Sequence, residues 1–274
     1  MLLRRFNEAE REGRYADFSS NDLTDIAEYF HTKNDLQHAL EIVDNAIDIY
    51  PGAVGPLIFR ARAALMTDEN CRLAEFYADQ VDDKTDLDYY YVVAEILIVD
   101  DKPEEAIKYL TDKYEEVEEE ERQDYILDVA TMFADYEMWD TADAWMAHYT
   151  DKEVSDYMEL EGRLLTVRGE YEKSEEIFNR LLDRDSFSST YWNLMATTQF
   201  FNRKFQESIT SCDYALAINP DDPDALLTKA NALFQMGNLD DAILIYAKYL
   251  KMFGEELPDD ADLKDYLSEI TDDE

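Results

Sequence analysis

A small residue recurs seven times along the chain at intervals of 32 to 36 residues, and this repeat constrains the fold more than any other feature. Each small residue lies three positions after the start of a predicted helix. The helix starts are Leu36, Cys71, Pro103, Trp139, Tyr171, Phe205 and Leu239, and the small residues are Ala39, Ala74, Ala106, Ala142, Ser174, Ser208 and Ala242. A fixed period of this length indicates stacked supersecondary units that need their neighbours to bury their apolar faces. The sequence therefore predicts a repeat protein.

The composition favours a folded, helical protein. Hydrophobic residues make up 46% of the 274 residues, and 19 Tyr, 13 Phe and 3 Trp provide large side chains for a core. This content argues against a disordered chain. Only 7 Gly and 6 Pro are present, which suits helices joined by short turns and argues against an all-β domain. We therefore expect one continuous all-α array.

Acidic residues dominate the charge of the chain. There are 65 Asp and Glu against 25 Lys and Arg, and the formal net charge is −40. A field of this sign repels phosphate backbones and anionic lipid headgroups, so we expect neither nucleic acid nor a membrane surface as a partner. It favours partners with basic segments. The simpler alternative is that the acidic surface only keeps the protein soluble.

The cysteines and the amino terminus favour a cytoplasmic protein. Cys71 and Cys212 do not resemble a disulfide framework, and we expect reduced thiols that face neighbouring helices. The first residues turn polar too soon for a signal peptide, and the sequence has no run of about 18 apolar residues to span a membrane. We expect a cytoplasmic location unless a targeting segment precedes this sequence.

The sixth unit shows the repeat pattern most fully. It reads Trp192-x2-Met195-Ala196-x2-Gln199, then Ser208-x3-Cys212, Ala215 and Pro220. This pattern resembles the tetratricopeptide repeat, a pair of antiparallel helices with the signature W-x2-L-G-x2-Y, then A-x3-F, then P. The resemblance implies an all-α, right-handed superhelical solenoid of antiparallel helix pairs.

Seven such units are expected, with a cap at each end. The units are 20–54, 55–86, 87–122, 123–154, 155–188, 189–222 and 223–256, between a capping segment at 1–19 and a capping helix with an acidic tail at 257–274. In the second cap, an amphipathic helix is predicted over 259–271. In the first, Leu2, Leu3 and Phe6 form a short apolar stripe. This stripe either caps the first unit or binds a partner.

In six of the units, another small residue lies 12 positions before the small residue of the second helix. Ala27, for example, precedes Ala39. Small residues at both places allow two helix axes to approach to roughly 8 to 10 Å. The second unit departs from this rule, because Arg62 occupies the equivalent position. Either its helices cross more loosely, or its first helix is shifted by one residue so that Ala61 or Ala63 makes the contact.

Two helix starts carry capping signals. Asp222 is expected to cap a helix that has Pro223 at its first position. Ser19 and Asp22 have the spacing of a capping box.

The resemblance also implies a binding groove. In the tetratricopeptide family, the first helix of each unit forms the inner wall of the superhelix through pattern positions 2, 5, 6, 9, 12 and 13. In this chain these positions include Phe59, Arg60, Met66, Tyr91, Glu95, Thr131, Glu159, Arg163, Asn193, Thr197, Phe200, Phe201, Asn231 and Phe234. Aromatic and amide side chains with few cations suit a peptide backbone or an acidic side chain. Alternatively, several of them, Phe59 and Phe201 first, pack between repeats.

Family members that bind carboxy-terminal peptides use a clamp of Lys and Asn at particular groove positions. The corresponding positions of the first unit hold Thr24 and Glu28. We therefore do not expect that kind of recognition.

The sequence offers no motif for catalysis, a metal or a cofactor. The three histidines, His31, His38 and His148, lie on different predicted helices, and carboxylate pairs are too common to be informative. A Gly-rich phosphate loop, a G-x-S-x-G elbow and an H-E-x-x-H helix are missing from the sequence. We expect a non-enzymatic scaffold, without a cofactor, that binds a peptide or protein segment. The alternatives are an acidic nucleic-acid mimic or chaperone for a basic protein, and a regulatory part of a longer enzyme or sensor.

Overall fold

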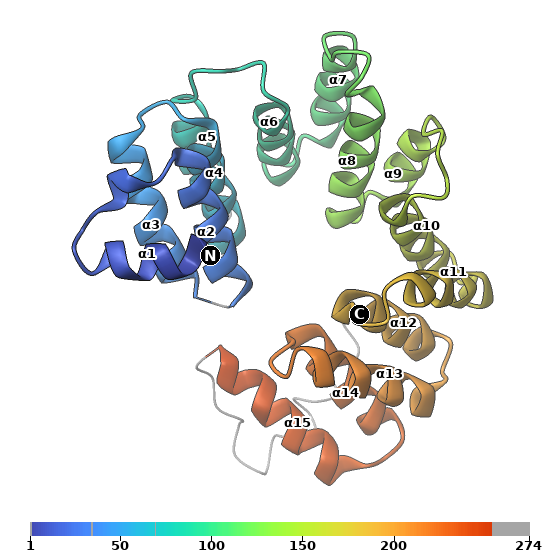
Figure 1. Cartoon of the computed structure of the whole chain (residues 1–274). Helices are drawn as coiled ribbons and strands as arrows, with labels where there is room; N and C mark the ends of the chain where they lie inside the picture. The colour runs from blue at the N-terminus through green and yellow to red at the C-terminus, as the bar shows by residue number, and fades with distance from the viewer. Residues whose placement is uncertain (1, 34, 69, 254–274) are drawn as a thin grey trace. The chain divides into compact units, whose positions relative to one another are not determined.

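The computed structural model describes residues 2–33, 35–68 and 70–253, and every regular element in these ranges is a helix (Figure 1). This confirms the predicted all-α repeat fold. The helices form two compact units, Met1–Tyr149 and Thr150–Glu274.

The first unit contains nine α-helices and one short 3-10 helix among its described residues. They are α1 (Leu2–Glu10), η1 (Tyr15–Asp17), α2 (Ser20–Thr32), α3 (Leu36–Ile49), α4 (Val54–Asp68), α5 (Cys71–Ala78), α6 (Leu87–Val99), α7 (Pro103–Tyr114), α8 (Arg122–Asp135) and α9 (Trp139–Met146). After α1, consecutive helices pack in pairs, beginning with α2 against α3.

The described part of the second unit contains six α-helices. They are α10 (Ser155–Val167), α11 (Tyr171–Arg184), α12 (Ser189–Phe201), α13 (Phe205–Ile218), α14 (Pro223–Gln235) and α15 (Leu239–Met252). Here too consecutive helices pack in pairs, such as α12 with α13 and α14 with α15. In both units the second helix of every pair begins at the residue that the repeat predicted, from Leu36 to Leu239.

The small residues of the repeat are buried where the two helices of a pair cross. All seven on the second helices, from Ala39 to Ala242, have 0% exposure. The two serines among them also bond across the crossing. The Ser174 hydroxyl donates to the Gly162 carbonyl at 2.9 Å, and the Ser208 hydroxyl donates to the Ala196 carbonyl at 2.8 Å. A small side chain thus permits close approach, and a hydroxyl there satisfies a backbone acceptor as well.

The turn inside a helix pair has one recurring conformation. Two residues before the second helix, φ is positive at Asp101 (59°), Glu137 (58°), Gly169 (74°), Arg203 (59°) and Gly237 (79°). Only glycine adopts this left-handed conformation without steric strain. The two glycines therefore ease a turn that the other three residues make under strain.

Helix α4 resolves the irregularity of the second unit. Ala61 is fully buried among residues of α4, α5 and α6. The Arg62 side chain is 37% exposed, and its Nε donates to both carboxylate oxygens of Glu95 on α6, at 3.2 and 3.1 Å. The helix is thus shifted by one residue, and Ala61 makes the close contact.

Both predicted helix caps are present. The Ser19 hydroxyl accepts from the Asp22 amide, and the Asp22 carboxylate accepts from the Ser19 amide, each at 3.1 Å. The Asp222 carboxylate accepts from the Ala225 amide at 3.1 Å, with Pro223 at the first helical position. These bonds satisfy amides that have no partner inside the helix.

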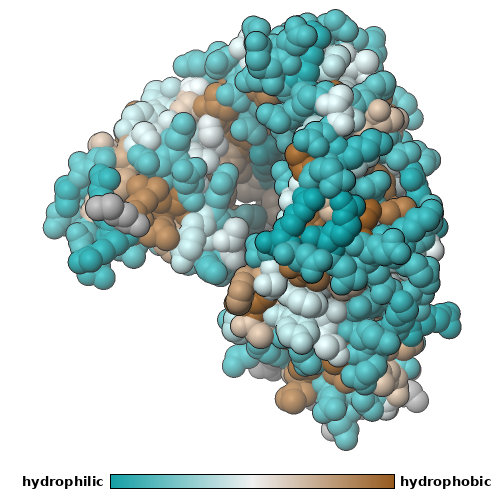
Figure 2. Space-filling view, turned by 45° about the vertical axis from the view of Figure 1, so that its right-hand side comes forward, coloured by the Kyte–Doolittle hydropathy of each residue, from teal (hydrophilic) through white to brown (hydrophobic). Residues whose placement is uncertain are grey.

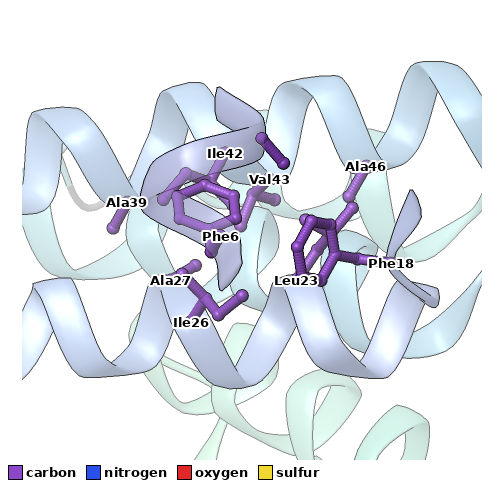
Figure 3. Close-up of a cluster of buried hydrophobic side chains, with 10 residues drawn as sticks. Phe6, Phe18, Leu23, Ile26, Ala27, Ala39, Ile42, Val43 and Ala46 are labelled. Atoms are coloured by element: carbon purple, nitrogen blue, oxygen red, sulfur yellow. The ribbon is translucent and has the colours of Figure 1, made fainter. Parts of the chain in front are cut away.

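The amino-terminal helix α1 packs on the first helix pair. Phe6 has 0% exposure and lies among side chains of α2 and α3, including Ile26 and Ile42 (Figure 3). Its ring meets the Phe18 ring edge-on, with 5.7 Å between centroids. Leu2 and Leu3 are partly buried against the same cluster. The helix predicted over 259–271 lies outside the described residues.

The visible face in the space-filling view is mostly hydrophilic, with smaller hydrophobic areas between the hydrophilic side chains (Figure 2). None of the described helices has the length and apolar character needed to cross a membrane. Cys212 is buried, and burial raises the pKa of its thiol to about 12.

Candidate functional site

A pocket of about 220 Å³ lies between the first helices of two successive pairs in the second unit, α12 and α14. Its wall includes five predicted groove residues, Phe201 among them. The lining residues are Asn193, Leu194, Thr197, Phe200, Phe201, Asp224, Leu227, Thr228 and Asn231. On α12, Asn193 and Thr197 are four residues apart, as are Asp224 and Thr228 on α14. This spacing places each pair on one side of its helix.

Asn193 is oriented by the cap of the neighbouring helix. Its Nδ2 donates to Asp222 Oδ1 at 2.8 Å. Because a carboxylate can only accept, this bond fixes which end of the amide faces Asp222. The other end, Oδ1, is a buried atom with no hydrogen-bond donor among the described residues.

Asp224 supplies the only charge among the described residues that line this pocket. The Asp224 side chain is exposed, but neighbouring protein atoms partly desolvate its carboxyl, and this desolvation, followed by repulsion from Asp222, raises the pKa of the carboxyl above the ordinary value. Both causes disfavour the ionised form. The pocket thus contains one negative charge that no described lining residue neutralises.

Two aromatic rings complete the wall. Phe200 and Phe201 meet edge-on, with 5.7 Å between centroids and 75° between planes, and Phe201 is 41% exposed. Asn231 is 2% exposed and accepts a hydrogen bond from the Tyr246 hydroxyl. Phe234 packs against the hydrophobic cluster of α14 and α15. The accessible part of this wall therefore includes the exposed Asp224 and Phe201 and the half-buried Asn193, Thr197 and Phe200.

A second pocket, of about 180 Å³, lies along the first helices of the first unit. It is lined by Thr24, Glu28, His31, Leu36, Gly55, Ile58, Phe59, Arg62, Ala63, Met66 and Asp88. Phe59 and Met66 are the predicted groove residues among them. Burial, followed by repulsion from Asp25, raises the pKa of Glu28. This wall is also acidic.

Arg62, not Arg60, is the cation on this wall. The predicted groove residue Arg60 has its Nε 2.8 Å from Asp44 on α3, and its guanidinium lies over the Tyr77 ring on α5. The cause is the one-residue shift of α4, since each residue turns a helix by about 100°. Burial disfavours the charge on Arg62, but Glu95 and Asp88 outweigh it, and the pKa of the guanidinium lies above its ordinary value.

Two further predicted groove residues are buried in contacts within the first unit. Tyr91 is 7% exposed, and its hydroxyl donates to Asp128 on α8 at 3.1 Å. Glu95 is 8% exposed and pairs with Arg62. Their side chains join neighbouring helices, and Glu95 also lines a pocket of about 710 Å³ together with Arg62 and Tyr136. Thr131 on α8 and Arg163 on α10 are half-buried.

A mostly apolar pocket of about 550 Å³ lies on the second helices α7 and α9, and Ile126 of α8 is also among its lining residues. Tyr114 and Trp145 form part of its wall, with 6.2 Å between ring centroids. These residues were not among the predicted groove residues, because the family's groove positions lie only on first helices. The same phase does reach Asp224, which lies six residues before Ala230 at pattern position 2.

No group of three or more His, Cys, Asp or Glu side chains within the described ranges is arranged to hold a metal ion. The three histidines lie in different parts of the first unit: His31 is on α2, His38 is on α3, and His148 follows α9. His38 Nε2 lies 2.6 Å from Glu10 Oε1, in the contact between α3 and α1. This histidine joins the terminal helix to the first pair.

Sequence and fold comparisons agree on one type of repeat. Residues 202–264 match the tetratricopeptide repeat family. None of the curated proteins compared with this sequence matches it. The fold is similar to a tetratricopeptide repeat protein from Parabacteroides merdae ATCC 43184, at 14% identity over 91% of this chain and 97% of that one, with a TM-score of 0.59. It is also similar to yeast Tom70, at 15% identity over 99% of this chain and 56% of that one, with a TM-score of 0.63.

Proposed function

Since the chain is a tetratricopeptide repeat protein, we propose that it is a non-enzymatic scaffold that binds a peptide or protein segment along its first helices. The segment is expected to carry basic residues, because the net charge is −40 and the described pockets along first helices each have more acidic than basic lining residues. The cysteine usage of the sequence supports a reducing, cytoplasmic site of action.

The observation that carries this proposal is the pocket between α12 and α14. Asn193, Thr197, Phe200 and Asn231 stand at positions that the resemblance to the tetratricopeptide family assigns to a groove, and they line one concave site. Concave sites with mostly apolar walls and a few polar groups are the usual places for ligands. The pocket is small, so it suits one side chain of a longer bound segment.

The test is capture of binding partners by the full chain and by a variant with Arg163→Glu and Asn193→Ala. Loss of partners from the variant, with unchanged helicity, is expected. The control carries Arg180→Glu, which makes the same charge change on an exposed residue of α11, and Asn219→Ala. Asn219 also donates to Asp222, at 3.5 Å, but lies outside the pocket lining. Identical partner sets for wild type and the groove variant would refute the proposal.

The charge itself favours a second candidate, a chaperone for a basic protein or a mimic of nucleic acid. Binding by a diffuse acidic field weakens steeply with salt, because exposed charges are screened beyond about 8 to 10 Å at physiological ionic strength. A segment held in the first-helix pockets depends less on salt. Partner capture over a series of sodium chloride concentrations separates the two functions.

A further inference from the structure

We propose that the pocket between α12 and α14 is a subsite for one basic side chain, a lysine ammonium or an arginine guanidinium, of the bound segment. This inference rests on the proposed function and adds the chemistry of one contact. It differs from the sequence-based expectation, which was a peptide backbone or an acidic side chain. Three features of the pocket support a cation.

The first feature is an acceptor that lacks a donor. Asn193 Oδ1 is buried at the pocket wall and has no donor among the described residues. Rotating the amide does not remove the problem, because Oδ1 would then face Asp222 Oδ1, which now receives the Nδ2 hydrogen bond. Asp222 is itself committed to the Ala225 amide. The orientation is thus fixed, and a ligand that donates hydrogen bonds is what Oδ1 requires.

The second feature is a carboxylate without a counter-charge. Asp224 is the only charged residue among the described residues that line the pocket, and α12 carries no charged residue at all. The nearest described cation on α14, Lys229, pairs instead with Asp213, at 2.5 Å between Nζ and Oδ1. Partial desolvation and Asp222 together raise the pKa of the Asp224 carboxyl. A bound cation would reverse that shift, whereas a bound anion would be repelled.

The third feature is the pair of rings. Phe200 and Phe201 line the same pocket and meet edge-on. Aromatic faces attract ammonium and guanidinium groups, and they also cover the methylene stem of a long basic side chain. The hydroxyls of Thr197 and Thr228 add acceptors to the lining. Acceptors, one negative charge and aromatic faces together match a basic side chain.

The experiment titrates the full-length protein, labelled with nitrogen-15, with capped Gly-Ser-Lys-Ser-Gly. The readout is the side-chain amide signal of Asn193, assigned by its loss in Asn193→Ala. Parallel titrations use peptides in which arginine, acetyl-lysine or glutamate replaces the lysine. We expect a saturable shift with lysine and arginine, and none with acetyl-lysine or glutamate.

Two variants provide a matched pair. Asp224→Asn removes the charge in the pocket, at the second residue of α14. Asp240→Asn removes the same charge at the second residue of α15; both side chains are exposed, but Asp240 lies outside the pocket lining. We expect Asp224→Asn to weaken binding of the lysine peptide by about tenfold or more, the factor typical of a charge-assisted hydrogen bond, and Asp240→Asn to leave it unchanged.

Each opposite result overturns the subsite. Equal shifts with lysine and acetyl-lysine would mean that the pocket takes the apolar stem, and equal weakening by the two variants would mean that the general acidic field attracts the peptide. Absence of any shift would remove the subsite altogether. None of these results refutes the proposed function. That function is tested separately, by whether the variant with Arg163→Glu and Asn193→Ala loses its partners. A melting curve for each variant shows whether it is folded, and the peptide series tests the subsite without any variant.

Discussion

Gly162 offers a sharp test of the helix crossing on which the repeat depends. A Cβ atom added there would lie 2.6 Å from Cζ and 2.7 Å from Cε1 of Phe178. These distances are about 1 Å shorter than the optimum of roughly 3.5 to 4.0 Å for two carbon atoms. The Phe178 ring has 0% exposure, so it has little room to move away. Gly162→Ala is therefore expected to force α10 and α11 apart or to distort the ring.

The net effect is the difference of two opposing contributions. Overpacking of a core costs about 1 to 3 kcal/mol, and the short distances place this site near the upper end. Replacing a helical glycine by alanine gains about 1 kcal/mol in helix propensity. The free energy of unfolding should therefore fall by about 2 kcal/mol, because the clash exceeds the gain.

Urea denaturation followed by circular dichroism measures this loss. The control is the same substitution in a Phe178→Leu background, where the shorter side chain leaves room for the new Cβ. There Gly162→Ala should stabilise by about 1 kcal/mol, so the two sites should couple by about 3 kcal/mol. If Gly162→Ala has the same effect in both backgrounds, the two residues do not make the contact described and the reasoning is refuted.

Three further predictions concern packing and charge. Ala27→Trp and Ala230→Trp, at fully buried positions, should each destabilise by roughly 1 to 3 kcal/mol or more in the same urea assay, and wild-type stability for both would mean that the repeat phase is wrong. Sodium chloride should raise the melting temperature because it screens a net charge of −40, and calcium chloride at matched ionic strength should differ only in degree; a stoichiometric, submicromolar calcium isotherm by calorimetry would contradict this. Hydrogen bonds from the Ser19 hydroxyl and amide lower the pKa of Asp22 below its ordinary 3.8, so its stabilisation is present above that pH and is lost as the pH falls through the lowered value. The difference in urea midpoint between wild type and Asp22→Asn should accordingly shrink between about pH 5 and pH 2, and a constant difference would argue against the capping box.

The sequence alone was sufficient for the helices and their pairing pattern. Helix starts, caps and small residues are local signals, because each depends on backbone groups or side chains a few residues apart. The second helices accordingly begin where the repeat placed them, from Leu36 to Leu239. The family resemblance also selected residues of α12 that line the pocket, since that helix keeps the register of the pattern.

Only the tertiary structure decided which side chains line the pockets. A one-residue shift turns a helix by about 100°, and this shift in α4 exchanged Arg60 for Arg62 on the first-helix wall. Tyr91 and Glu95 were found to be occupied with Asp128 and Arg62 from other helices. The pocket between α12 and α14 likewise exists only because packing brings the exposed Asp224 carboxylate and the buried Asn193 amide oxygen into one lining, and a sequence pattern carries no information on such an arrangement.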